Sequence, residues 1–124
     1  MEHSTTPTND LTSLKNRLLK NPGVILESLQ ESYQVSMCEI IEALPQEMWK
    51  RINGEHFVSV LKKISTIGGV VVVTNTVDGI LEYKGPFPNG ELSHGFYNLQ
   101  GEKVGLHGHL KPQRCKNIYF LQRP

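Results

Sequence analysis

The distribution of glycine divides this chain into two unlike parts. Only Gly23 precedes position 54, and the other ten of the eleven glycines follow it. Glycine weakens helices and supplies the backbone freedom that tight turns need. We therefore expect helices in the first part and strands joined by turns in the second. The fold class that this pattern predicts is α+β, with N-terminal helices followed by an antiparallel β-meander of about five strands.

Local patterns in the first part predict where helices begin. Leucines recur at helical intervals after Asp10, whose side chain can cap a helix N-terminus. Ser36 and Glu39 form a capping-box pattern, in which each side chain binds the backbone N–H of the other residue. Met48 and Trp49, at a junction between helices, are expected to pack in the core.

The same patterns predict the domain organisation. Residues 1–9 are expected to form a disordered leader. Residues 10–66 are expected to form a helical subdomain, because apolar residues recur there at helical spacing. Residues 67–124 are expected to form the antiparallel sheet part of the same single domain.

Strand and turn signals fill the second part. Val70 to Val73 is an uninterrupted β-branched run, typical of a central strand covered on both faces. Asp78-Gly79 is a tight-turn signal that returns the chain to a second strand. Residues 92–99 and 106–110 are expected to pair as the next hairpin, and residues 117–122 to form the last strand.

The composition excludes several function classes. Acidic and basic residues nearly balance at a formal net charge of +1, whereas a general nucleic-acid binder needs a basic surface. Cys38 and Cys115 are far apart and lack a CxxC pairing, so we expect reduced thiols. No stretch approaches the length of about 18 apolar residues that a membrane helix needs, and the N-terminus has no apolar signal core. These features predict a cytoplasmic protein whose partners are neither nucleic acid nor membrane.

Histidines are concentrated near the end of the chain. His94, His107 and His109 fall within sixteen residues, and side chains two apart on a strand share a face. Imidazole is the commonest metal ligand in proteins. Gly101 followed by His107-Gly108-His109 matches the opening of the cupin motif of non-haem iron or manganese sites, but no glutamate or later histidine completes that ligand set. The alternative is that these are ordinary strand residues.

A family resemblance is carried by residues 86–115, with the sequence PFPNGELSHGFYNLQGEKVGLHGHLKPQRC. This segment resembles the HutX/ChuX family of cytosolic haem-utilisation carrier proteins, and the resemblance extends upstream to about residue 15. It rests on the Pro-Phe-Pro run, on Gly95 to Leu99 and on Gly108 to Lys111. It implies an α+β homodimer from a bacterium that uses haem as an iron source. It also implies a chain shortened at its C-terminus, because family members continue with further strands and a helix.

The resemblance also implies a ligand and a site. The bound cofactor would be haem b, carried and handed on without chemistry, with a haem-accepting or haem-degrading protein as partner. The histidine of the family's Gly-His-Leu-Lys strand maps onto His109, the expected metal ligand. A second histidine of some members falls on Asn75, which cannot supply an imidazole. Haem further needs apolar surface and cations for its propionates. The expected cofactor-binding residues are therefore His109, His107, His94, Tyr97, Phe96, Lys111, Arg114 and Asn75.

Two other functions stay open on the sequence alone. A related haem-uptake family has members that degrade haem, so an iron-releasing enzyme is one alternative. A cupin-like metal-binding protein is the other. We expect no catalytic residues, because the sequence shows no evident constellation for proton delivery or reductase docking, and a non-enzymatic carrier is favoured.

Overall fold

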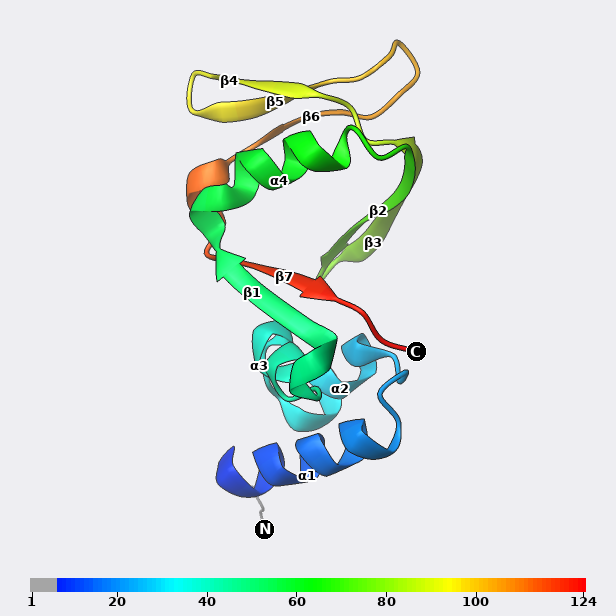
Figure 1. Cartoon of the computed structure of the whole chain (residues 1–124), viewed down its shortest axis with the longest axis vertical. Coiled ribbons are helices and arrows are strands. Elements are labelled where there is room, and N and C mark those ends of the chain that lie inside the picture. The colour runs from blue at the N-terminus through cyan, green and yellow to red at the C-terminus, as the bar shows by residue number, and fades with distance from the viewer. Residues whose placement is uncertain (1–6) are drawn as a thin grey trace. The chain divides into compact units, whose positions relative to one another are not determined.

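The computed structural model of the chain describes residues 7–124 (Figure 1). Its elements in chain order are α1 (Pro7–Lys20), α2 (Leu26–Tyr33), α3 (Met37–Glu42), η1 (Gln46–Met48), β1 (Trp49–Asn53), η2 (Gly54–His56), α4 (Phe57–Ile64), β2 (Gly69–Thr76), β3 (Gly79–Pro86), β4 (Gly90–Ser93), β5 (Phe96–Gln100), β6 (His107–Leu110), η3 (Pro112–Arg114) and β7 (Asn117–Leu121). Helices precede antiparallel hairpins, which confirms the predicted α+β class. Across residues 7–124, none of the helices has the length and apolar character that spanning a membrane requires.

The chain divides into two compact units at a different place from the predicted boundary. The first unit comprises the chain up to Arg51 together with Tyr119–Pro124, and the second comprises Ile52–Ile118. The predicted division at residues 66 and 67 assigned α4 to the helices, whereas α4 belongs to the unit that holds the hairpins. The reason is packing, because α4 turns Val58, Leu61 and Ile64 toward the apolar cluster under those strands. That the chain acts as a single domain stays a prediction.

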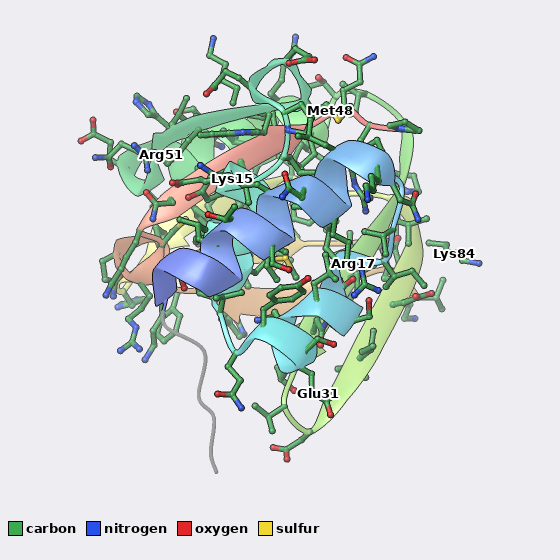
Figure 2. The ribbon with its side chains drawn as sticks, turned by 90° about the horizontal axis from the view of Figure 1, so that it is seen from below. Lys15, Arg17, Glu31, Met48, Arg51 and Lys84 are labelled. Carbon is green, nitrogen blue, oxygen red and sulfur yellow. The ribbon has the colours of Figure 1, made fainter. Side chains whose placement is uncertain are left out.

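Leucine and isoleucine side chains build the core of the first unit. The buried set contains residues from all three helices and the segment after them: Leu14, Leu18, Leu26, Leu29, Ile40, Ile41, Ala43 and Leu44. Within each helix these positions lie three, four or one residue apart, which places them on one side of the helix. Charged side chains such as Glu31 lie on the outside (Figure 2).

The helix starts of the first unit test two predictions. Helix α1 begins at Pro7, so the predicted disordered leader is wrong for residues 7–9, and residues 1–6 lie outside the described part of the chain. Proline suits the first helical position because its missing N–H would be unpaired there in any case. The capping box of α3 is confirmed. The Glu39 N–H donates to Ser36 Oγ at 3.1 Å, and the Ser36 N–H donates to Glu39 Oε1 at 2.9 Å.

Strands β1 and β7 form a two-stranded sheet that the sequence did not predict. The Gly54 N–H donates to Lys116 O at 3.0 Å and the Gln122 N–H donates to Met48 O at 2.8 Å. Because partner numbers fall on one strand as they rise on the other, the pair is antiparallel. The ring of Trp49 packs against Tyr119, with centroids 6.1 Å apart. The predicted helix junction is thus a strand whose tryptophan packs on the core.

Tyr119 also takes part in a polar cluster of the first unit. Its hydroxyl donates to a carboxylate oxygen of Glu42, which also accepts from Arg51 at 2.8 Å. Burial of Tyr119, together with the hydrogen bond to Glu42, raises the pKa of the phenol to about 12. The hydrogen bond from Tyr119 and the charge of Arg51 hold the pKa of Glu42 below its ordinary value of 4.5.

The raised pKa of Tyr119 predicts a loss of stability in alkali. An unfolded tyrosine releases its proton near pH 10.0, whereas folded Tyr119 retains it until about pH 12. Its contribution to the free energy of unfolding is therefore complete below pH 10.0 and disappears as the pH rises to about 12. Urea unfolding across this window should show a steeper loss for the wild type than for Tyr119→Phe, which removes this titration but keeps the ring. Equal losses in the two proteins would contradict the assignment.

The strands of the second unit do not form one five-stranded meander. They form the β2–β3 hairpin and the β4–β5–β6 sheet, while β7 pairs with β1. Pro86 and Pro88 explain the break between β3 and β4, because a proline cannot donate to a strand ladder. The η3 turn, which starts at Pro112, likewise ends β6 before the chain reaches β7.

Strand β2 is also less covered than the sequence predicts. Its only strand neighbour in the described chain is β3, and Val71 and Val73 are 56% and 52% exposed. Their cross-strand partners on this face are Lys84 and Glu82. Lys84 extends outward from the hairpin in Figure 2. The β-branched run therefore forms one strand of a hairpin. On one face of that strand, Val70 and Val72 are partly buried against the apolar cluster of the second unit.

The predicted strand over residues 92–99 is interrupted by a tight turn. Ser93 pairs with Phe96, so His94 and Gly95 form a two-residue hairpin loop between β4 and β5. Both have positive φ angles, 56° and 81°. A type I′ turn, which is one of the favoured turns in two-residue hairpins, requires positive φ at both central residues. Glycine adopts such angles without steric cost and histidine does so only occasionally, which is why the turn was not evident from a His-Gly pair.

Candidate functional site

The outer face of the β4–β5–β6 sheet gathers the histidine-rich segment. Asn98 lies directly opposite His109, and Gln100 lies opposite His107. Because directly paired residues share a face and side chains alternate along a strand, five side chains lie on one side of β5 and β6. We call this set the histidine face, and it consists of Phe96, Asn98, Gln100, His107 and His109. The prediction that His107 and His109 point the same way is confirmed by this register.

His109 is held by a hydrogen bond to its cross-strand partner. The distance between His109 Nδ1 and Asn98 Oδ1 is 2.6 Å. An amide oxygen only accepts hydrogen bonds, so Nδ1 carries the hydrogen. In a neutral imidazole the other nitrogen, Nε2, then keeps its lone pair, and a lone pair in the ring plane is what binds a metal. The sequence did not single out Asn98, although the register across β5 and β6 makes it the direct neighbour of His109.

Phe96 and Lys111 surround this imidazole. The ring of Phe96 meets that of His109 edge-on, with centroids 6.1 Å apart and an angle of 76° between planes. Lys111 Nζ lies 5.5 Å from the centre of the Phe96 ring, which is within range of a cation–π contact. An exposed imidazole, a half-buried aromatic ring and an exposed cation therefore lie together at one end of the histidine face.

The other two histidines are placed differently from His109. His107 Nε2 lies 2.6 Å from the backbone oxygen of Glu102, so this nitrogen donates to the loop before β6. His94 sits in the tight turn at the tip of the β4–β5 hairpin and is exposed. His107 thus shares the face with His109 but presents a different nitrogen, and His94 lies in the turn between β4 and β5.

Tyr97 does not belong to the histidine face. It is 0% exposed and packs with Phe87 and Leu99 in the core of the second unit. Its neighbours in the chain, Phe96 and Asn98, point to the opposite side, as alternation along β5 requires. Burial raises the pKa of its phenol. The expectation that Phe96 and Tyr97 offer a common surface to a ligand is therefore wrong for Tyr97.

Asn75 and Arg114 lie on other elements. Asn75 is near the end of β2, where it pairs with Ile80 in the β2–β3 hairpin and is exposed. Figure 1 shows the tip of this hairpin at the end away from the β4–β5–β6 sheet. Arg114 is exposed on η3, three residues beyond Lys111. The register that joins Asn98 to His109 includes neither of them.

A groove lies beside the histidine face. It has a volume of about 420 Å³, within the range of small-molecule sites. Its wall mixes apolar and polar residues, namely Tyr83, Pro86, Pro88, Gln100, Gly101, Glu102, Gly105 and Leu106. Glu102, whose backbone oxygen binds His107, belongs to this wall, so the groove and the histidine face share the loop between β5 and β6.

The side chains of the histidine face suit a metal ion that is already held mostly by the ligands of a cofactor. No group of three or more histidine, cysteine, aspartate or glutamate side chains is arranged to hold a metal ion among residues 11–124, whose side chains the structure describes. Haem needs from a protein an axial donor, apolar contact and cations near its propionates. His109, Phe96 and Lys111 supply one of each, so the residues present fit haem.

Comparison with known proteins gives a family match over the whole second unit and the last strand. The haem-utilisation ChuX/HutX family matches residues 50–124. A curated relative, the intracellular heme transport protein HutX of Vibrio cholerae, is 32% identical over 107 residues, which cover 86% of this chain and 55% of the relative. The chain thus spans about half the length of this relative.

Solved structures with the same fold agree. The crystal structure of a protein from Erwinia carotovora has a TM-score of 0.81 and 36% identity, covering 89% of this chain and 68% of the other. The structure of the heme-binding protein ChuX has a TM-score of 0.78 and 31% identity, covering 90% and 68%. The matched segment includes the whole histidine face. The chain therefore belongs to the haem-utilisation ChuX/HutX family.

Proposed function

We propose that this chain binds haem b and carries it for bacterial haem uptake and iron utilisation, without chemistry on the haem. The observation that carries this proposal is the exposed imidazole of His109, whose Nδ1 is engaged by Asn98 while Nε2 keeps its lone pair. Relatives named for heme transport and heme binding support the choice of ligand.

His109 Nε2 would donate to the iron, and the ring of Phe96 would contact the porphyrin. Lys111 would pair with a propionate, since its Nζ already lies over Phe96 and its stem can swing without unfolding the strand. A binding face that is open rather than enclosed suits a carrier, because a ligand that must be handed on has to leave. His107, His94, Arg114 and Asn75 stay predictions as further haem contacts.

Three further parts of the proposal rest on the family resemblance. The protein would act in the cytoplasm, as a homodimer, and would pass haem to an accepting or degrading protein. It would not itself be an enzyme, a choice supported by relatives that are named for heme transport and heme binding. Size-exclusion mass at two concentrations tests the dimer.

Haemin titration tests the central proposal. Wild-type protein should give a saturable Soret shift, and His109→Ala should weaken haem binding by at least about tenfold, since removing a metal-site contact has effects of that order. His107→Ala is the matched comparison on the same strand face and should lose less haem affinity than His109→Ala, because His107 Nε2 is engaged by the Glu102 backbone oxygen. Unchanged binding by His109→Ala would remove His109 from the ligand role.

Incubating the loaded protein with ascorbate and catalase separates a carrier from an enzyme. We expect the Soret band to persist. Loss of the band with release of iron, despite the catalase, would establish haem degradation instead. Stoichiometric iron or manganese in the purified protein without porphyrin would favour a cupin-like site.

A further inference from the structure

We propose that Asn98 is a positioning residue that sets the tautomer of His109, and that His107 is held in the opposite tautomer. The two histidines share one strand face, yet only His109 then presents a bare Nε2 to a metal. This inference rests on the proposed function only for its consequence in haem binding. The tautomers themselves are properties of the haem-free chain.

The orientation of the Asn98 amide is fixed by three backbone carbonyls. Its Nδ2 donates to the oxygens of Glu91 at 3.2 Å, Ser93 at 3.3 Å and Phe96 at 3.3 Å. All three partners only accept hydrogen bonds. A flipped amide would place its own oxygen against them, which would replace three attractive contacts by repulsive ones. Oδ1 must therefore face β6.

This orientation determines which nitrogen of His109 carries the hydrogen. Oδ1 of Asn98 lies 2.6 Å from His109 Nδ1, and two acceptors cannot form that contact. Nδ1 is therefore protonated, and the neutral ring leaves Nε2 without a hydrogen. The edge contact with Phe96 limits rotation of the same ring. Both the tautomer and the direction of the Nε2 lone pair are thus set before any ligand arrives.

His107 provides an internal contrast two residues earlier. Its Nε2 lies 2.6 Å from the backbone oxygen of Glu102, which can only accept. Nε2 is therefore the protonated nitrogen of His107, and a protonated nitrogen cannot bind iron. An imidazole without such partners exchanges between both tautomers, so part of its population is always unable to ligate through Nε2. Asn98 keeps His109 in the tautomer that can ligate through Nε2, whereas the Glu102 carbonyl keeps His107 in the tautomer that cannot.

Long-range ¹H–¹⁵N spectra of the haem-free protein test the inference directly. At about pH 8.5, two units above the pKa of free histidine, the His109 ring should appear as the Nδ1–H form and the His107 ring as the Nε2–H form. His109→Ala and His107→Ala assign the two signals by their loss. In Asn98→Leu, the His109 signals should shift to an exchanging mixture dominated by the Nε2–H form. Finding His109 as Nε2–H in the wild type would overturn the inference without any variant.

Gln100→Leu is the matched control for Asn98→Leu. Gln100 lies on the same face of β5, opposite His107, and its side chain contacts the Glu91 carboxylate at 3.4 Å. This variant should leave the His109 tautomer unchanged, whereas Asn98→Leu should change that tautomer and weaken haemin binding by about tenfold. Equal tautomer effects of the two variants, or none, would overturn the role of Asn98. If the tautomers are as stated but His109→Ala binds haem normally, the positioning role stands and the proposed ligand fails.

Discussion

Replacing Tyr97 by alanine should lower the free energy of unfolding by about 3–5 kcal/mol, the usual cost of removing a buried aromatic ring. Tyr97 is 0% exposed and belongs, with Phe87 and Leu99, to the buried core of the second unit. Lys62 covers the ring from one side, with its Nζ 5.7 Å from the ring centre. Because small domains are stable by only about 5–15 kcal/mol, this one change should remove much of the stability. Urea unfolding followed by circular dichroism measures it.

Tyr97→Phe separates the ring from its hydroxyl. The Tyr97 hydroxyl is buried near the backbone of Gly90, but no partner with full hydrogen-bond geometry is found for it among residues 11–124. An unpaired buried hydroxyl costs free energy, so the phenylalanine variant should be as stable as the wild type or more stable. It should also keep haemin affinity, because Tyr97 points away from the histidine face. A clear loss of haem binding in a folded Tyr97→Phe protein would mean that the Tyr97 hydroxyl contributes to haem binding.

Replacing Gly54 by alanine should cost about 3 kcal/mol or more, at the upper end for overpacking. A Cβ at this position would lie 1.9 Å from the backbone oxygen of Cys115 and 2.9 Å from the carbonyl carbon of Lys116. Backbone cannot swing aside as a side-chain tip can, so η2 and η3 would have to separate. That movement would also break the bond from the Gly54 N–H to Lys116.

Gly69→Ala is the comparison for this effect. A Cβ at Gly69 would meet nothing within 4 Å, and alanine at a compatible position can even stabilise slightly by restricting the unfolded chain. We expect thermal unfolding of Gly69→Ala within a few degrees of the wild type and a much lower midpoint for Gly54→Ala. Similar midpoints for the two variants would mean that the close approach at Gly54 is not rigid.

Features encoded within a few residues were predictable from the sequence. The capping box at Ser36 and Glu39 is complete within four residues and formed as expected. Pairings between distant segments were not. β1 and its partner β7 are five-residue strands separated by most of the second unit. Nothing in the sequence of either strand indicates that it pairs with the other. The break between β3 and β4 was marked by prolines, but their consequence for sheet number depends on tertiary packing.

The same distinction between local features and long-range pairings applies to the candidate site. The shared face of His107 and His109 followed from strand alternation alone. Phe96 and Tyr97 are adjacent on a strand, so the same rule places them on opposite faces. The prediction that they share a ligand-binding surface was therefore wrong because the rule was not applied to them. Asn98 was hidden because its role depends on the register between β5 and β6, which sequence alone leaves open. Which nitrogen each histidine presents is likewise set by partners across a strand or a loop, not by neighbours along it.

The discontinuity of the first unit has a consequence during protein synthesis. Its helices and β1 leave the ribosome early, but β1 has no strand partner until residues 117–121 follow. At roughly 5–20 residues per second, this interval lasts several seconds. During that time β1 exposes unpaired backbone that other chains can join. Arg123, which later donates to the backbone oxygens of Pro22 and Val24 at 2.8 Å, closes the unit last. Slower translation lengthens this interval, so the yield in a slowly translating host should depend more on chaperones that shield nascent strands.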